Sequence, residues 1–145
     1  MSWPMWIAFV CHLVPTVAMG IFGVIYLVSA EFMPYHAAAV GMNWTAVPPR
    51  FRVLILALMK AVGGAALAVS VLELFLLFVP FWQGAIWALV AIPVGGIVAS
   101  SGGLYATVYL LRKAPPIPPW TATPPWWAAV LCILLFATGL VLSLL

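Results

Sequence analysis

The sequence predicts an all-α integral membrane protein, in which one domain over residues 1–145 forms a bundle of four transmembrane helices. Hydrophobic residues make up 68% of the 145-residue chain, and charged residues make up only 5%. A soluble domain typically devotes about a quarter of its residues to charged side chains, so this chain cannot cover its surface with water-compatible groups. Four apolar runs, each with room for the roughly 20 residues that cross a bilayer, take up most of the length.

The first two helices are predicted at about 4–30 and 50–80. A proline near the start of the first run is harmless, because its missing N–H would have no helical partner there. Pro15 lies inside the run and predicts a kink. The run lacks the basic region of a secretory signal peptide, so we expect it to be a retained helix. The second run follows a Pro-Pro pair and ends at Pro80.

The last two helices are predicted at about 81–112 and 126–145. The third run begins at a Phe-Trp-Gln-Gly turn and ends at two basic residues, and Pro93 inside it predicts a second kink. The fourth run follows another Pro-Pro pair and continues to the last residue of the sequence. At 1.5 Å per residue, about 20 residues are just long enough to span the hydrocarbon core.

The two connections at about 31–49 and 113–125 should lie on the same side of the membrane. One basic pair opens the second helix and another ends the third. The positive-inside rule places these pairs in the cytoplasm, with both chain termini outside. We therefore expect a multi-pass protein of a bacterial inner membrane in that orientation.

The two connections differ in character. In the first, Pro34 is suited to start a short helix and Gly41 to end it. The second has six prolines over residues 114–125, which predicts a stiff and extended segment.

Small residues indicate where helices pack, because lipid gives no hydrophobic drive for association and close approach depends on small side chains. We name the small residues at every fourth position of the third helix the predicted ribbon: Ala91, Gly95, Ala99 and Gly103. Further small residues lie on the second helix, at Gly63 and Gly64, and on the first, at Gly20 and Gly23. We expect a tightly packed bundle; the alternative is that the predicted ribbon holds a partner subunit or a flat pigment or lipid.

Away from the ends of the predicted spans, three residues of the Asp, Glu, Lys, Arg and His types stand out, namely His12, Lys60 and Glu73; each is costly inside a membrane and needs a reason. Lys60 is expected to extend its stem back to the headgroups. His12 and Glu73 fall at a similar predicted depth, and on neighbouring antiparallel helices they would meet. Such a pair is either a buried hydrogen bond that fixes helix register or a site that handles a proton or ligand. A Glu73 without a partner is the remaining alternative.

Metal and cofactor sites receive little support from the sequence, and we predict none. His36 lies in the first connection, so it cannot share a haem with His12 across the bilayer. A haem or pigment with His12 as its single axial ligand stays open as a weaker alternative. The two cysteines show no metal or redox spacing.

A second group of polar residues surrounds the first connection. His36, Arg50, Arg52 and Lys60 are candidates for binding a lipid phosphate. The alternative is an ordinary polar interface whose charges set the topology.

The plan of four short spans, with the lone Glu73 in a Val-Leu-Glu-Leu stretch near the outer end of the second, resembles the DoxX-like small membrane proteins. The resemblance covers the first two predicted helices, and no activity is transferred from it.

These observations favour a non-catalytic accessory or scaffold subunit that packs laterally in a homo-oligomer or larger membrane complex. Membrane lipids are expected partners, and nucleic acid is not, because the cations do not form one basic patch. No catalytic signature such as a phosphate loop or HExxH motif is present. The question of enzymatic activity stays open: the alternative is a small membrane enzyme or proton-coupled carrier that acts on a quinone or lipid through His12 and Glu73.

Overall fold

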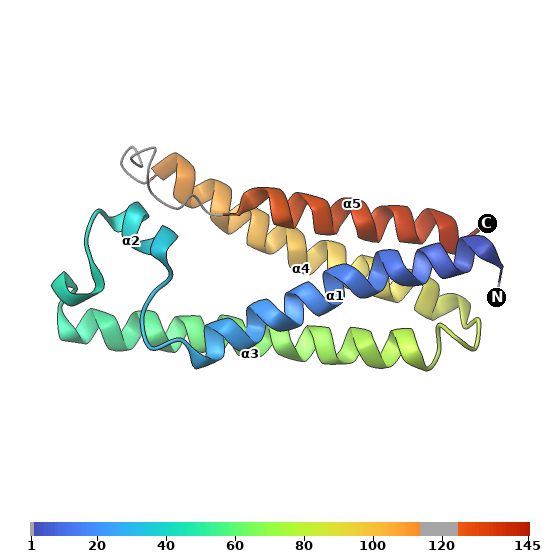
Figure 1. The fold of residues 1–145 in the computed structure, drawn as a ribbon, viewed down its shortest axis with the longest axis horizontal. Coiled ribbons are helices and arrows are strands. Elements are labelled where there is room, and N and C mark those ends of the chain that lie inside the picture. Colours follow the sequence, from blue (N-terminus) through green and yellow to red (C-terminus); the bar gives the residue numbers. More distant parts are fainter. Residues whose placement is uncertain (1, 114–124) are drawn as a thin grey trace.

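The computed structural model describes residues 2–113 and 125–145, which form helices and no strands. The four long helices are α1 (Trp3–Val28), α3 (Pro49–Phe78), α4 (Ile86–Lys113) and α5 (Trp126–Ser143), and between α1 and α3 lie the short α2 (Pro34–Val40) and the 3₁₀ turn η1 (Trp44–Ala46). The long helices alternate in direction, so both chain termini lie at one end of the bundle (Figure 1). We call this the terminal end, and the opposite end, where α2 lies, the connection end.

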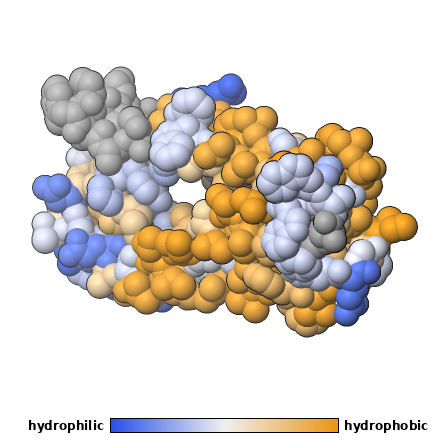
Figure 2. Space-filling model, turned by 45° about the vertical axis from the view of Figure 1, so that its right-hand side comes forward, coloured by the Kyte–Doolittle hydropathy of each residue, from blue (hydrophilic) through white to orange (hydrophobic). Residues whose placement is uncertain are grey.

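The four long helices are each long and apolar enough to cross a membrane. The shortest, α5, has 18 residues, or about 27 Å at 1.5 Å per residue. Orange, hydrophobic residues dominate the middle of the molecule, and hydrophilic residues gather toward its two ends (Figure 2). The chain is therefore a small multi-helix membrane protein, as the sequence predicts.

Helix α1 links α3 to α5, because it packs against both of them. Helix α4 packs mainly against α5, and its contact with α3 is smaller. The separation between α3 and α4 increases from the terminal end to the connection end (Figure 1). The main apolar core lies near the terminal end, where the buried side chains include Phe9, Leu77, Phe81 and Phe136.

Glycines bring α1 and α3 into backbone contact. A Cβ added to Gly23 would lie 2.8 Å from the carbonyl oxygen of Gly63, and a Cβ on Gly63 would lie 2.8 Å from that of Gly23. Gly20 in the same way makes room for the hydroxyl of Ser70, which is 2.6 Å from the added Cβ position. Gly64 takes no part in this close approach, since its nearest neighbour is a Leu27 methyl group at 4.0 Å.

The predicted ribbon on α4 faces the chain's own bundle only in part: a Cβ on Gly95 would lie 3.4 Å from Oε1 of Glu73 on α3. Ala91, Gly95 and Gly103 are exposed and Ala99 is half-buried. The buried positions of α4 are shifted by one residue, to Ile92, Gly96 and Ser100. Neighbouring helical positions are about 100° apart around the axis, and both series hold small residues, so spacing alone does not identify the inward one.

Helix boundaries depart from the predicted ranges mainly at the start of α4. The helix begins at Ile86 because residues 79–85 form a turn, in which Gly84 adopts a positive φ of 69°. Pro15 and Pro93 both lie inside continuous helices, and the kinks expected there remain predictions. The stiff connector predicted over 114–125 lies almost wholly outside the described residues.

The first connection folds against the start of α3. The short helix expected there is confirmed as α2, which begins at Pro34 and is capped by Gly41 with a φ of 68°. Arg52 fastens the connection, because its Nε donates to the carbonyl of Val47 at 2.7 Å and its Nη2 to that of Thr45 at 2.5 Å. The same guanidinium lies 5.8 Å from the ring centre of Trp44.

We expect Arg52→Leu to loosen this connection, because two carbonyl groups lose their donor. Proteolysis near residues 43–48 of reconstituted protein should accelerate about fivefold or more, the effect of losing charge-assisted hydrogen bonds of roughly 1.5–3 kcal/mol, reduced by exposure. Arg50→Leu is the matched control, since Arg50 is exposed and should give the wild-type rate. Equal rates for all three proteins would contradict the fastening role.

Candidate functional site

The interior of the bundle contains a polar cluster, which we define as His12, Thr16, Ser70 and Glu73. The hydroxyl of Thr16 donates to Oε2 of Glu73 at 2.8 Å, and the hydroxyl of Ser70 donates to the backbone carbonyl of Thr16 at 2.8 Å. All four side chains are buried. Two hydrogen bonds at Thr16 thus join α1 to α3, in addition to the glycine contacts.

His12 is enclosed by aromatic rings and by α5. Its ring stacks on Phe136 with an interplanar angle of 26° and meets Phe81 edge to face. A Cβ on Gly139 would lie 2.5–2.9 Å from the imidazole atoms, so only glycine fits there. Within residues 2–113 and 125–145, neither Nδ1 nor Nε2 of His12 has a hydrogen-bond partner.

The hydrogen bond considered between His12 and Glu73 is not formed. Both residues are buried in the same part of the bundle, but Glu73 bonds to Thr16, which lies one turn from His12 on α1. The second carboxyl oxygen, Oε1, has no partner among the described residues. This oxygen lies beside α4, 3.4 Å from the position of a Cβ on Gly95.

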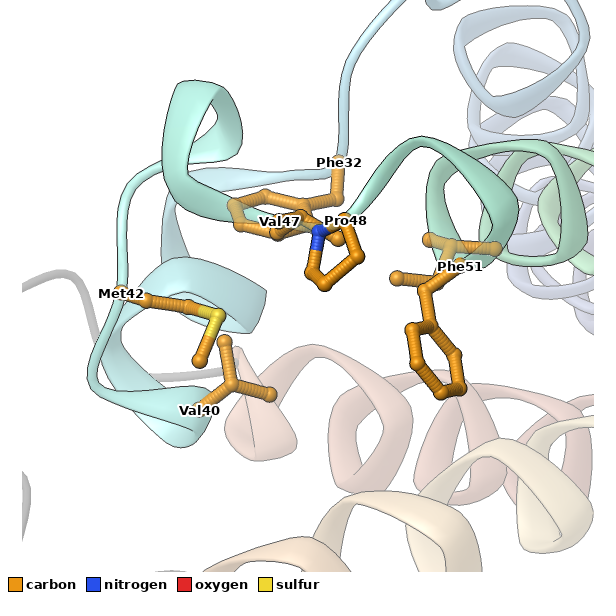
Figure 3. Close-up of a pocket in the computed structure, with 7 residues that line it drawn as sticks. Phe32, Val40, Met42, Val47, Pro48 and Phe51 are labelled. Carbon is orange, nitrogen blue, oxygen red and sulfur yellow. The ribbon is translucent and has the colours of Figure 1, made fainter.

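Neither His12 nor Glu73 lines either of two apolar hollows on the surface of the described chain. One of these is a shallow hollow outside α1, beside Trp3, Trp6 and Ile7. The other, of about 330 Å³, lies at the connection end. Figure 3 shows its apolar lining, with Phe51 on α3 and Val40 and Met42 at the end of α2. His12 is 0% exposed and Glu73 is 4% exposed, so both are sealed within packed helices.

The candidates for a lipid-phosphate site do not converge. Arg52 is occupied by two backbone carbonyls, and Nζ of Lys60 donates to the carbonyl of Leu27 at 2.7 Å, near the end of α1. Nε2 of His36 lies 3.4 Å from the hydroxyl of Tyr26. Arg50 is exposed on the first turn of α3. Arg52 and His36 therefore hold the connection to the bundle, and Lys60 joins α3 to α1.

Tyr26, Tyr35 and His36 form a second polar cluster at the connection end. The hydroxyl groups of Tyr26 and Tyr35 are hydrogen-bonded to each other. Burial raises the pKa of Tyr35 and lowers the pKa of His36 below its ordinary value of 6.5. Neutral side chains thus suit this contact between α1 and α2, since desolvation disfavours the charged forms.

We expect the docking of α2 to weaken as the pH falls below about 6.5, the ordinary value for histidine. The undocked state binds more protons than the docked one in this range, so stability is complete above that pH and is lost as the pH falls toward the lower pKa of docked His36. Hydrogen exchange of the α2 amides should accelerate in this window. His36→Gln should abolish the dependence, and an unchanged pH profile in that variant would assign the effect to another group.

Sequence reasoning missed Thr16, Ser70 and Tyr26. The signal for Thr16 was its position one turn after His12, and that for Ser70 was its position three residues before Glu73. Helical neighbours at these spacings share a face. Among the described residues no group of three or more His, Cys, Asp or Glu is placed to hold a metal ion, and both cysteines are free.

No family model, curated protein or solved structure matches this chain. The likeness to DoxX-like proteins therefore stays a resemblance of sequence pattern alone.

Proposed function

We propose that this protein is a non-catalytic accessory or scaffold subunit that packs laterally against another subunit in the membrane. The observation that carries the proposal is the outward position of small residues on α4. We define the small face of α4 as its exposed small residues along one side: Ala91, Gly95, Gly102 and Ala106.

Gly95 of the small face approaches Glu73 of α3, whereas Gly102 faces open space. A Cβ on Gly102 would meet no atom within 4 Å, and glycine weakens a helix by up to about 1 kcal/mol relative to alanine. Bulky apolar residues would suit a surface that only contacts lipid. Small residues instead permit two helices to approach closely, which is how transmembrane helices associate.

The packing of His12 and Glu73 supports a structural role over a catalytic one. A membrane enzyme or proton-coupled carrier would bring its reacting groups to a cavity that admits a quinone or lipid. Here these groups are enclosed by Phe81, Phe136 and α5. A haem or pigment on His12 would likewise require the ring to leave this packing.

Extraction in a mild detergent followed by native mass spectrometry tests the proposal. We expect the chain to leave the membrane bound to at least one further subunit, either a second copy or another membrane protein. A clean monomer without any bound subunit would count against the proposal. A visible absorption band in the purified protein would instead support cofactor binding.

A carrier or enzyme is the second candidate, favoured by the ring nitrogens of His12 and Oε1 of Glu73, which have no hydrogen-bond partner in the part of the chain that the structure describes. This candidate requires Glu73→Gln to change transport or turnover of a hydrophobic substrate in reconstituted vesicles. Identical rates for the variant and the wild type would remove its basis.

A further inference from the structure

The hollow at the connection end has a wholly apolar lining. Its volume of about 330 Å³ is at the lower end of the range for small-molecule sites. Figure 3 shows Val40 and Met42 on one side of it and Phe51 on the other. Water in such a site would lack polar partners, so an alkyl chain is the chemistry that the lining favours.

The guanidinium group of Arg52 lies at the rim of this hollow. Its Nε donates at 2.7 Å to the carbonyl of Val47, a lining residue. Its Nη2 donates to the carbonyl of Thr45, and the ring centre of Trp44 is 5.8 Å away, so the group is held in place. A guanidinium has five N–H donors, and these two bonds leave three of them. Arg52 is half-buried, which keeps part of the group open to a ligand.

Positive charge gathers at the same end of the bundle. Four of the chain's five Lys and Arg side chains lie in the first turn of α3 or the last turn of α4: Arg50, Arg52, Arg112 and Lys113. The structure describes both acidic residues of the chain, and of the two only Glu31 lies near this end. The first turn of α3 has no acidic side chain, so the partial positive charge of the helix N-terminus adds to that of the cations.

An apolar hollow with a cationic rim is complementary to an anionic amphiphile. We propose that this hollow binds one acyl chain of an anionic phospholipid, whose phosphate accepts hydrogen bonds from Arg52. Arginine and phosphate form strong charge-assisted bonds, and a guanidinium that is already held loses little freedom on binding.

The extent of the lining favours a lipid over a protein helix. On α3 it covers Pro48 to Ile55, about 10 Å along the axis at 1.5 Å per residue. Transmembrane helices that pack on each other can use the whole hydrocarbon core, about 30 Å. The hollow shares no residue with the small face of α4, so this lipid site does not depend on the proposed lateral packing.

The lipid preference of the wild-type full chain is the first test. Delipidated protein in a mild detergent is titrated with phosphatidylglycerol or with phosphatidylcholine of identical acyl chains, and bound lipid is counted by native mass spectrometry. We expect phosphatidylglycerol to bind about fivefold tighter, the effect of one cation near an anionic headgroup. Equal affinities would overturn the proposed headgroup contact.

Glycerol phosphate separates the acyl chain from the headgroup in the same assay. It carries a phosphate and no alkyl chain, so it should not displace phosphatidylglycerol at equal concentration. Displacement as efficient as that by the lipid would mean that the hollow takes no part in binding, and the proposal would fall.

Phe51→Asp tests the hollow itself. Phe51 is 59% exposed, and a carboxylate in the first turn favours a helix, so the variant should fold. Its negative charge in the hollow should abolish the preference for phosphatidylglycerol. Val53→Asp is the matched control, because Val53 is 71% exposed and does not line the hollow, and it should retain most of the preference. Equal preferences in the two variants would contradict the site.

Cysteine labelling shows what covers the hollow in a bilayer. In protein whose Cys11 and Cys132 are replaced by alanine, Phe51→Cys should react with a bulky uncharged maleimide more slowly in phosphatidylglycerol nanodiscs than in phosphatidylcholine nanodiscs. Val53→Cys should react equally in both. The same rate for Phe51→Cys in both lipids would overturn the proposal. Protection that persists in lipid-free detergent together with a bound subunit would assign the hollow to a protein partner instead.

Discussion

Gly63→Ala should destabilise the protein at the upper end of the range of about 1–3 kcal/mol that overpacking costs. The added methyl group would lie 2.8 Å from the carbonyl oxygen of Gly23 and from Cβ of Tyr26, and 3.0 Å from the backbone nitrogen of Leu27. Two of these atoms belong to the backbone of α1, so relief requires the helices to separate. The free energy of unfolding in mixed micelles measures the effect.

Gly64→Ala is the matched control for this prediction. It lies next to Gly63 on α3, but its added methyl group would be 4.0 Å from Leu27. Because alanine favours the helix by up to about 1 kcal/mol over glycine, this variant should be neutral or slightly more stable. Similar losses for the two variants would show that α1 and α3 do not touch at Gly63.

Gly96→Ala is the second substitution with a large expected effect. Its methyl group would overlap the ring of Phe136, which is 0% exposed and stacked on His12. The ring cannot move without disturbing His12 and the contact of α5 with Gly139. We expect a loss of about 1–3 kcal/mol, measured as above and accompanied by a change in the nuclear magnetic resonance signals of the His12 ring.

Gly102→Ala provides the comparison on the same helix. Nothing lies within 4 Å of its added methyl group, so the folded monomer should not be destabilised. If Gly96→Ala proved as stable as Gly102→Ala, the assignment of the inward side of α4 would be wrong.

The transmembrane architecture could be predicted from the sequence because it depends on features that lie within single segments. The length of the apolar runs and the near absence of charge decide the number of helices. Pro34 and Gly41 bound α2 as expected, since proline starts a helix and a left-handed glycine ends one. Gly23 and Gly63 could also be recognised in the sequence as packing residues, because small side chains permit helices to approach closely.

The inward side of α4 could not be predicted, because two series of small residues lie side by side on it. Gly96 faces Phe136 on α5 and Gly95 faces Oε1 of Glu73 on α3, and spacing along one helix cannot tell which neighbouring helix each residue meets. Similarly, counting residues from the predicted helix ends places His12 at about the depth of Glu73. Such a count cannot resolve one helical turn, about 5.4 Å. Thr16 lies within that uncertainty and takes the hydrogen bond instead.

The outward small face of α4 is the feature on which the account of function depends, and Gly102→Leu tests it most directly. The leucine side chain has room in the monomer but would hold a neighbouring helix away. Ala18→Leu is the control, because Ala18 is an exposed small residue on α1. In native mass spectrometry of gently extracted protein, we predict that Gly102→Leu loses its bound subunit while Ala18→Leu retains it. An intact assembly in Gly102→Leu would contradict the account.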